Sequence, residues 1–153
     1  MKEKIEIVIK ISKEGKHVNQ KFADSYYEEV ALGVDFTARD IQSRHKEKGL
    51  PWELAKGFDN SAPISNFLPK SQFPDLRNLN FKLDVNGEMR QEGNTSFMLF
   101  SFDYIIAFVS QYITLKKGDL IYTGTPAGVA KVNVGDRLEG YIENQKMLDF
   151  YIK

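Results

Sequence analysis

The chain has 153 residues, a length that fits one domain with a buried core. Its 21 Lys and Arg balance its 21 Asp and Glu, so overall charge does not favour nucleic acid or an anionic membrane as a partner. Cysteine is absent, which excludes disulfides and thiolate metal sites, and no apolar run is long enough to cross a bilayer. We therefore expect a single domain spanning residues 1–153, in the cytoplasm.

The first predicted element is a strand over residues 5–11. Every second residue in this range is isoleucine, and this period of two predicts one dry face and one mixed face. Asn19 can cap a helix that reaches about Val30, because its side chain can accept a hydrogen bond from the first turn. The apolar segment over 31–36 then predicts another strand.

Thr37 is predicted to cap the next helix. Asp40 stands three residues later, as in a capping box, and Gly49 marks the expected C-terminal end of this helix. Residues 51–58 predict a turn followed by an irregular or short helical segment. A further strand is expected over 62–68.

The second half of the chain is predicted to contain a hairpin, a helix and three strands. Asn86-Gly87 between two strand-like runs is the strongest hairpin signal in the sequence. Apolar residues at helical spacing predict a helix over 101–113. The remaining strands are expected over 119–123, 136–143 and 146–152. Because strands dominate and helices are inserted between them, we predict an α+β fold.

Asp35 is the first candidate site residue. A carboxylate between Val34 and Phe36 costs free energy to bury unless a partner compensates its charge. That partner can be the backbone at the start of a helix, or a hard cation bound by the carboxylate. The run itself leaves both interpretations open.

Arg39 and Gln42 lie three residues apart, so they share one face of the predicted helix. A guanidinium, an amide and a helix N-terminus together suit a substrate carboxylate, and a solvated helix face is the alternative. Lys56 stands between apolar neighbours. It can bind an oxyanion, or its stem can simply cover apolar surface.

The turn over 123–128 contains Thr125 and two glycines. Its backbone amides can cradle an anion, or the glycines can serve only to end a strand. It is not a Walker loop, because no Gly-Lys-Ser/Thr follows. His17 and His45 lie among polar residues and are expected at the surface, so no catalytic pair of histidine with serine or cysteine is predicted.

These segments occur together and in order in one known family. The chain resembles the fumarylacetoacetate hydrolase family, specifically its small acylpyruvate hydrolase and oxaloacetate decarboxylase branch. The resemblance runs from about Ile5 to the C-terminus. The matching segments are DFTARDIQ (35–42), KGLPW (48–52), AKGF (55–58), API (62–64), VNGE (85–88), RQ (90–91), NTS (94–96), KGDLI (117–121) and TGTPAGV (123–129).

The resemblance implies a β-rich roll of mixed sheets with about three helices packed outside, usually as a homodimer. It also implies a Mg²⁺ or Mn²⁺ ion held by two glutamates of a Glu-x-Glu strand and one aspartate. Glu6 matches the second glutamate, and Asp35 matches the aspartate. The residues that match a pocket for a small keto-acid substrate are Arg39, Gln42, Lys56 and Thr125.

The chain departs from the family pattern in two places. Lys4 stands at the position of the first metal glutamate, on the same strand face as Glu6, and its ammonium group is expected to weaken metal binding. Family members also carry an N-terminal segment with a His-x-x-Glu pair that has no counterpart here. We therefore expect the chain to be truncated at its N-terminus relative to the family.

The resemblance implies three alternative functions. The first is divalent-metal-dependent hydrolysis of acylpyruvate-type β-diketo acids, or decarboxylation of oxaloacetate. In it, Arg39 and Gln42 hold the substrate carboxylate, Thr125 orients the substrate, and Lys56 neutralises the developing oxyanion, with Gln42 and Lys56 as the catalytic residues. The second is isomerisation or tautomerisation of 2-hydroxy-dienedioates on the same site. The third is a truncated family member with little or no activity.

Overall fold

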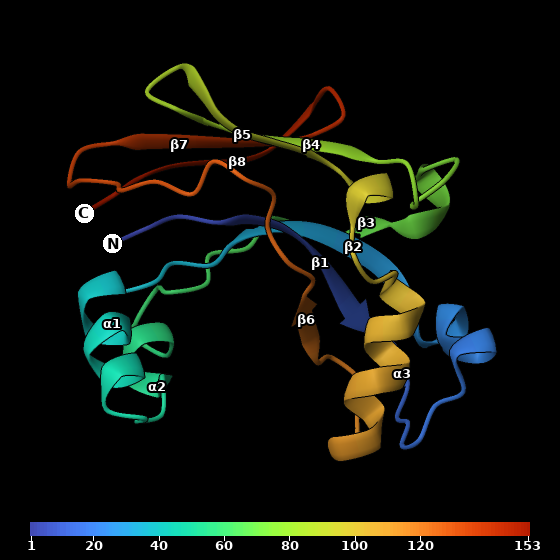
Figure 1. The fold of residues 1–153 in the computed structure, drawn as a ribbon. Helices are drawn as coiled ribbons and strands as arrows, with labels where there is room; N and C mark the ends of the chain where they lie inside the picture. The colour runs from blue at the N-terminus through green and yellow to red at the C-terminus, as the bar shows by residue number, and fades with distance from the viewer.

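Two four-stranded antiparallel sheets make up the computed structural model, which describes residues 1–153 (Figure 1). The first sheet has the order β3-β2-β1-β6 and is built from β1 (Ile5–Ile11), β2 (Tyr27–Val34), β3 (Leu68–Pro69) and β6 (Leu120–Tyr122). The second has the order β5-β4-β7-β8 and is built from β4 (Asn80–Val85), β5 (Glu88–Asn94), β7 (Arg137–Ile142) and β8 (Gln145–Tyr151). All strand pairs are antiparallel, where the resemblance implied mixed sheets.

The α-helices lie below the first sheet in Figure 1, on the side away from the second sheet. They are α1 (Arg39–Glu47), α2 (Glu53–Lys56) and α3 (Phe102–Tyr112), with short 3₁₀ segments η1 (Gln20–Tyr26), η2 (Lys70–Gln72) and η3 (Thr95–Phe97). This arrangement confirms the predicted α+β class with helices outside the sheets. None of the helices has the length and apolar character that a bilayer crossing requires.

The isoleucine face of β1 forms the centre of the core. All four of its isoleucines are buried, as the period of two predicted. They belong to one cluster of 23 buried residues that includes Leu83 and Leu138 of the second sheet. Gly140 in β7 lets the two sheets approach closely, because a Cβ there would lie 2.8 Å from Cδ2 of Leu32. The dry face of β1 is thus fixed against the second sheet, and its other face is mixed, with the buried Val8 between Glu6 and Lys10.

The segment after Asn19 differs from its prediction. Asn19 does cap the first turn, since its side chain accepts a hydrogen bond from the N–H of Lys21. However, this turn is the 3₁₀ segment η1, and β2 begins at Tyr27 instead of a helix continuing to Val30. Pairing with β1 buries Tyr27 and Val30, and this burial outweighs their local helical spacing.

The strand predicted over 62–68 is also largely absent. This segment makes only an isolated bridge between Ile64 and Gly33, and the regular strand β3 has two residues. Pro63 lacks the N–H that a regular ladder needs, which limits pairing to scattered bonds with the edge of β2.

The elements of the second half form as predicted. Asn86 and Gly87 adopt φ of 56° and 80° at the turn between β4 and β5, the left-handed geometry that favours these residue types. Ser101 caps α3 by accepting a hydrogen bond from the N–H of Tyr104. Strands β6 and β7 lie within the predicted ranges, and β8 begins one residue before its predicted range of 146–152.

Candidate functional site

A group of charged side chains lies on the face of the first sheet that is opposite the isoleucines. Glu6 pairs with Gly33 across β1 and β2, and the N–H of Asp35 donates to the carbonyl of Lys4 at 2.8 Å. Alternate residues of a strand share a face, so the side chains of Lys4, Glu6 and Asp35 project to the same side of the sheet. We call Lys4, Glu6, Asp35 and Lys56 the charged cluster.

Asp35 is compensated by two lysines. Its Oδ2 lies 3.2 Å from Nζ of Lys4, and the ammonium group of Lys56, the last residue of α2, contacts the same oxygen. The Lys56 ammonium also donates to the hydroxyl of Thr37 at 3.0 Å. Burial lowers the pKa of Lys56, the nearby Lys4 adds to this effect, and the contact with Asp35 opposes it.

Glu6 is 6% exposed and is held by the turn that follows β6. Its Oε2 accepts a hydrogen bond from the N–H of Gly124 at 2.8 Å. Burial raises the pKa of Glu6, the charge of Asp35 raises it further, and the bond from Gly124 and the charges of Lys4 and Lys56 oppose the rise. The carboxyl groups of Glu6 and Asp35 are therefore close enough to influence each other electrostatically.

Tyr122 forms an apolar wall beside the charged cluster. Its ring packs over Gly33, where a Cβ would lie 2.5 Å from Cε1 of the ring, and its hydroxyl donates to the carbonyl of Ala62 at 2.9 Å. Burial, together with the charges of Glu6 and Asp35, raises the pKa of Tyr122 to about 12. The phenol is thus a neutral group at ordinary pH.

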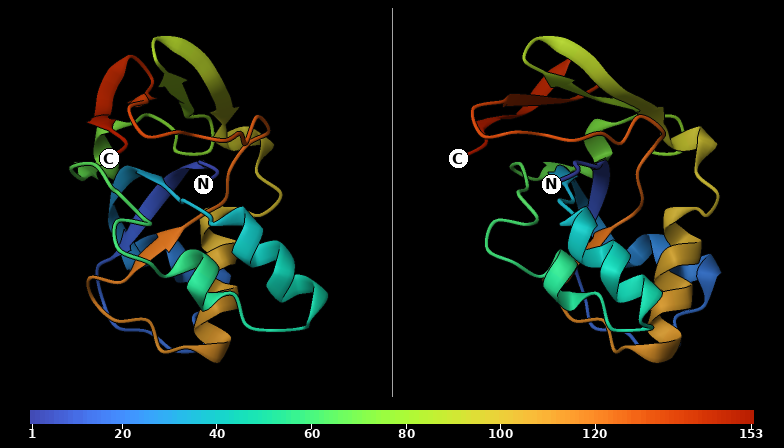
Figure 2. Two further views of the ribbon diagram at one scale, coloured as in Figure 1. Left: turned by 90° about the vertical axis from the view of Figure 1, so that its left-hand side faces the viewer. Right: turned by 60° about the vertical axis from the view of Figure 1, so that its left-hand side comes forward.

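Arg39 and Gln42 share one face of α1, as their spacing predicted. Nη1 of Arg39 donates to Oε1 of Gln42 at 2.6 Å, and Nε of Arg39 is buried without a partner. The N–H of Ala38 donates to the carbonyl of Ala55 at 3.0 Å, so the start of α1 is attached to the end of α2 beside Lys56. Figure 2 shows these two helices side by side below the first sheet.

Thr37 does not cap α1, contrary to the prediction. The N-cap position is Ala38, and no side chain caps this helix. Thr37 is instead fully buried in an isolated bridge with Lys2, where its hydroxyl is available to Lys56. The sequence has the pattern of a capping box, but the Thr37 hydroxyl accepts a hydrogen bond from Lys56 and does not cap the helix.

Thr125 lies apart from the charged cluster, in the loop after β6. Its Oγ1 accepts a hydrogen bond at 3.1 Å from Nε2 of Gln91, a residue of β5 that is 2% exposed. Oε1 of the same Gln91 accepts the N–H of Ile5 at 3.0 Å, so one amide joins the loop to β1.

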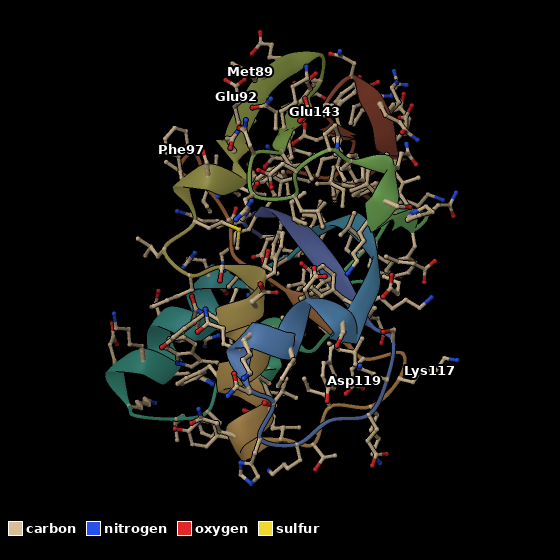
Figure 3. All side chains as sticks on the ribbon, turned by 90° about the vertical axis from the view of Figure 1, so that its right-hand side faces the viewer. Met89, Glu92, Phe97, Lys117, Asp119 and Glu143 are labelled. Carbon is tan, nitrogen blue, oxygen red and sulfur yellow. The ribbon has the colours of Figure 1, made fainter.

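A cavity of about 320 Å³ lies beside this loop. Gly124 and Thr125 line one side of it, and the segment from Phe97 to Phe100 lines another. Phe97 itself is 84% exposed and projects outward at the edge of the molecule (Figure 3). Because the N–H of Gly124 binds Glu6, the cavity and the charged cluster share one turn of the backbone.

The residues as arranged do not fit a divalent ion. The structure has no group of three or more His, Cys, Asp or Glu side chains that could hold one. Mg²⁺ and Mn²⁺ favour several oxygen ligands, whereas Oδ2 of Asp35 is occupied by Lys4 and Lys56, and Oε2 of Glu6 by Gly124. Oδ1 of Asp35 and Oε1 of Glu6 remain for a ligand, but an ion bound there would stand beside two ammonium groups that repel it. Binding of Mg²⁺ or Mn²⁺ by these carboxylates stays a prediction.

Residues 3–150 match the family profile described as fumarylacetoacetate (FAA) hydrolase C-terminal. The chain belongs to the fumarylacetoacetate hydrolase family. It is 46% identical over 149 residues to the mitochondrial oxaloacetate tautomerase FAHD1 of Mus musculus, a match that covers 97% of this chain and 67% of that protein. It is 43% identical over 131 residues to the mitochondrial oxaloacetate decarboxylase of Dictyostelium discoideum, covering 86% of this chain and 60% of that one.

Solved structures of the fumarylacetoacetate hydrolase family have the same fold. The fumarylpyruvate hydrolase of Pseudomonas aeruginosa, in complex with Mn²⁺ and pyruvate, superposes with a TM-score of 0.91 at 36% identity. That match covers 99% of this chain and 64% of the Pseudomonas chain. The chain thus spans about two thirds of the length of its relatives, and it belongs to a family of enzymes.

The sequence does not indicate three residues of the candidate site. The pattern at Thr37 predicts a helix cap, Gln91 stands only within a matching segment, and Tyr122 only within a predicted strand. The one available signal was Gly33, since a glycine inside a strand indicates close approach by another group. Nothing local to Gln91 indicates that its amide reaches a loop 34 residues away.

Proposed function

We propose that this chain acts on a small α-keto acid and that its reaction is the tautomerisation or decarboxylation of oxaloacetate. The named activities of the mouse and Dictyostelium relatives support this choice. The observation that carries the proposal is the charged cluster, in which two ammonium groups meet on one half-buried face of the first sheet.

Both reactions pass through an enolate. Removal of a proton from the carbon next to the keto group gives the enolate of oxaloacetate, whereas loss of CO₂ from that carbon gives the enolate of pyruvate. In each case negative charge develops on the former keto oxygen, and hydrogen-bond donors placed at that oxygen lower the barrier.

The lysines keep donors free for that oxygen. An ammonium group has three N–H donors. Lys56 directs its donors to Asp35 and Thr37, whereas Lys4 contacts Asp35 alone, so each has at least one left for a ligand. We propose that Lys56 and Lys4 donate hydrogen bonds to the developing oxyanion.

Arg39 and Gln42 are the proposed carboxylate-binding residues. Arg39 has a buried Nε without a partner, and the contact with Gln42 fixes the guanidinium at the start of α1. A guanidinium recognises a carboxylate with two parallel hydrogen bonds. Thr125, which faces the neighbouring cavity, is proposed to contact the far end of a longer substrate.

Hydrolysis of an acylpyruvate is the second candidate, because the Pseudomonas relative is a fumarylpyruvate hydrolase. Hydrolysis needs a positioned water and a base. Neither histidine is in the charged cluster: Nδ1 of His45 lies against the carbonyl of Pro51, and His17 is exposed near the carbonyl of Ser110. Decarboxylation needs neither this water nor a base, and tautomerisation needs a base but no water, so we place these two reactions first.

The test compares Lys56→Met with Lys10→Met. Lys10 lies on the same face of β1 but pairs with Glu29, away from the charged cluster. Loss of one preorganised donor is expected to lower turnover of oxaloacetate about a hundredfold. Absorbance of the enol form and release of CO₂ distinguish tautomerisation from decarboxylation. Equal rates in the two variants would contradict the proposal.

A further inference from the structure

We infer that the ammonium groups of Lys4 and Lys56 take the place of a divalent cation, so that this chain binds a small dicarboxylate or keto acid without a metal. The inference rests on the function proposed above, because it states how the same site recognises its ligand.

Two ammonium groups contact one carboxylate oxygen of Asp35, which puts their nitrogens next to each other. Asp35 is one of the two carboxylates that would hold a divalent ion. The lysines therefore supply two positive charges beside a predicted ion ligand.

The charges of the cluster balance, because Lys4 and Lys56 offset Glu6 and Asp35. A divalent ion would therefore gain no net attraction from the charged cluster and would lose its hydration shell. An anion would instead meet two ammonium groups whose N–H donors are not all used by Asp35 and Thr37.

The free N–H donors of the two lysines determine which ligand fits. Adjacent N–H donors of two lysines suit a ligand with two neighbouring oxygens, such as the carboxylate and keto oxygens of an α-keto acid. The Lys4 and Lys56 side chains are 17% and 31% exposed, so a ligand can reach them while water competes only in part. The solved structure of the Pseudomonas relative contains both Mn²⁺ and pyruvate. The dependence of ligand binding on Mn²⁺ is therefore the property to measure in this chain.

The test uses oxalate as the probe, because it presents two adjacent carboxylate groups. Isothermal titration is carried out on the whole chain after removal of metals with EDTA, and again with Mn²⁺ present. We expect oxalate to bind in EDTA, with an affinity that Mn²⁺ changes by less than about twofold. This comparison needs no variant. Oxalate binding that occurs only with Mn²⁺ would overturn it.

Two substitutions at Lys4 test whether its ammonium group binds the oxalate. Lys4→Gln is expected to weaken oxalate binding in EDTA about tenfold, because one charge-assisted donor is lost. The matched control Lys10→Gln, on the same strand face, should bind oxalate as the unmodified chain does. Lys4→Glu should abolish binding in EDTA and make it depend on Mn²⁺, with bound Mn²⁺ detected directly by electron paramagnetic resonance. Unchanged binding by Lys4→Gln would contradict the inference.

Failure of the proposed function gives a different pattern. If oxalate binds in EDTA but oxaloacetate is neither tautomerised nor decarboxylated, the metal-free site stands and the enzymatic proposal fails. If oxalate binds only with Mn²⁺ and turnover also requires Mn²⁺, the enzymatic proposal stands and the inference is wrong.

Discussion

The side-chain amide of Gln91 attaches Thr125 to the core of the molecule, with 3.1 Å between its nitrogen and the threonine hydroxyl. The same nitrogen also lies within 3.3 Å of two carbonyls of the loop, and the amide oxygen accepts the first N–H of β1. One buried side chain from the second sheet thereby fixes both the loop and the strand that carries Glu6.

Gln91→Leu is expected to lower the free energy of unfolding by about 3 kcal/mol, because it leaves several buried polar groups without partners. Chemical denaturation measures this change. The control Gln72→Leu removes an exposed amide that contacts only Gln145, and should change stability by less than about 0.5 kcal/mol. Equal effects of the two substitutions would show that the Gln91 bonds are not important for stability.

Thr37→Val should reduce turnover several-fold while Thr37→Ser retains it. Valine has the shape of threonine but cannot accept the hydrogen bond from Lys56, whereas serine keeps the hydroxyl. Steady-state kinetics on oxaloacetate checks both variants, and thermal unfolding shows whether each is folded. A valine variant that is folded and fully active would rule out a positioning role for Thr37.

Glu3→Gln is expected to stabilise the protein at neutral pH by about 1 kcal/mol. Glu3 is fully buried, its Oε2 has no partner, and burial raises the pKa of its carboxyl above the ordinary value. Because the folded state binds this proton more tightly, the wild-type chain loses stability as pH rises from the ordinary pKa of the group through its folded pKa.

The difference between Glu3→Gln and wild type should therefore be largest at neutral pH and disappear in acid. Urea unfolding at a series of pH values tests this expectation. Glu14→Gln, at an exposed site, is the matched control and should give no pH-dependent difference. A constant offset at every pH would mean that ionisation of Glu3 is not the cause.

We also propose that the chain forms a homodimer through the exposed aromatic face of α3. Phe100, Tyr104 and Phe108 stack at centroid distances of 4.7 and 6.1 Å, and Tyr112 continues the row. Phe108→Lys should convert a dimer to a monomer in sedimentation experiments, because it places a charge in an apolar contact. Phe22→Lys, at another exposed phenylalanine, should leave the mass unchanged. A monomeric wild-type chain would contradict this proposal.

The sequence predicted the elements whose patterns are local. Alternating isoleucines specify β1 because each buries its side chain on one face, and Asn86-Gly87 specifies a hairpin because both residues tolerate positive φ. The helix expected to reach Val30 was wrong, since helical spacing and strand pairing compete for the same apolar residues. Pairing with β1 buries more of their apolar surface than a helix at this position would.

The candidate site was predictable only in part. The common face of Lys4 and Glu6 follows from the period of two, and the contact of Arg39 with Gln42 follows from helical spacing. The meeting of Lys56 with Asp35 depends on how α2 packs, across 21 residues of chain. The placing of Gln91 depends on the second sheet, 86 residues from Ile5. No local sequence pattern indicates contacts between residues that lie so far apart in the chain.

Position 4 lies beside the row of isoleucines but takes no part in it. A change of charge at this position leaves the buried isoleucines in place and alters only the pairing with Asp35. The electrostatic character of this face can therefore diverge while the isoleucine core is retained.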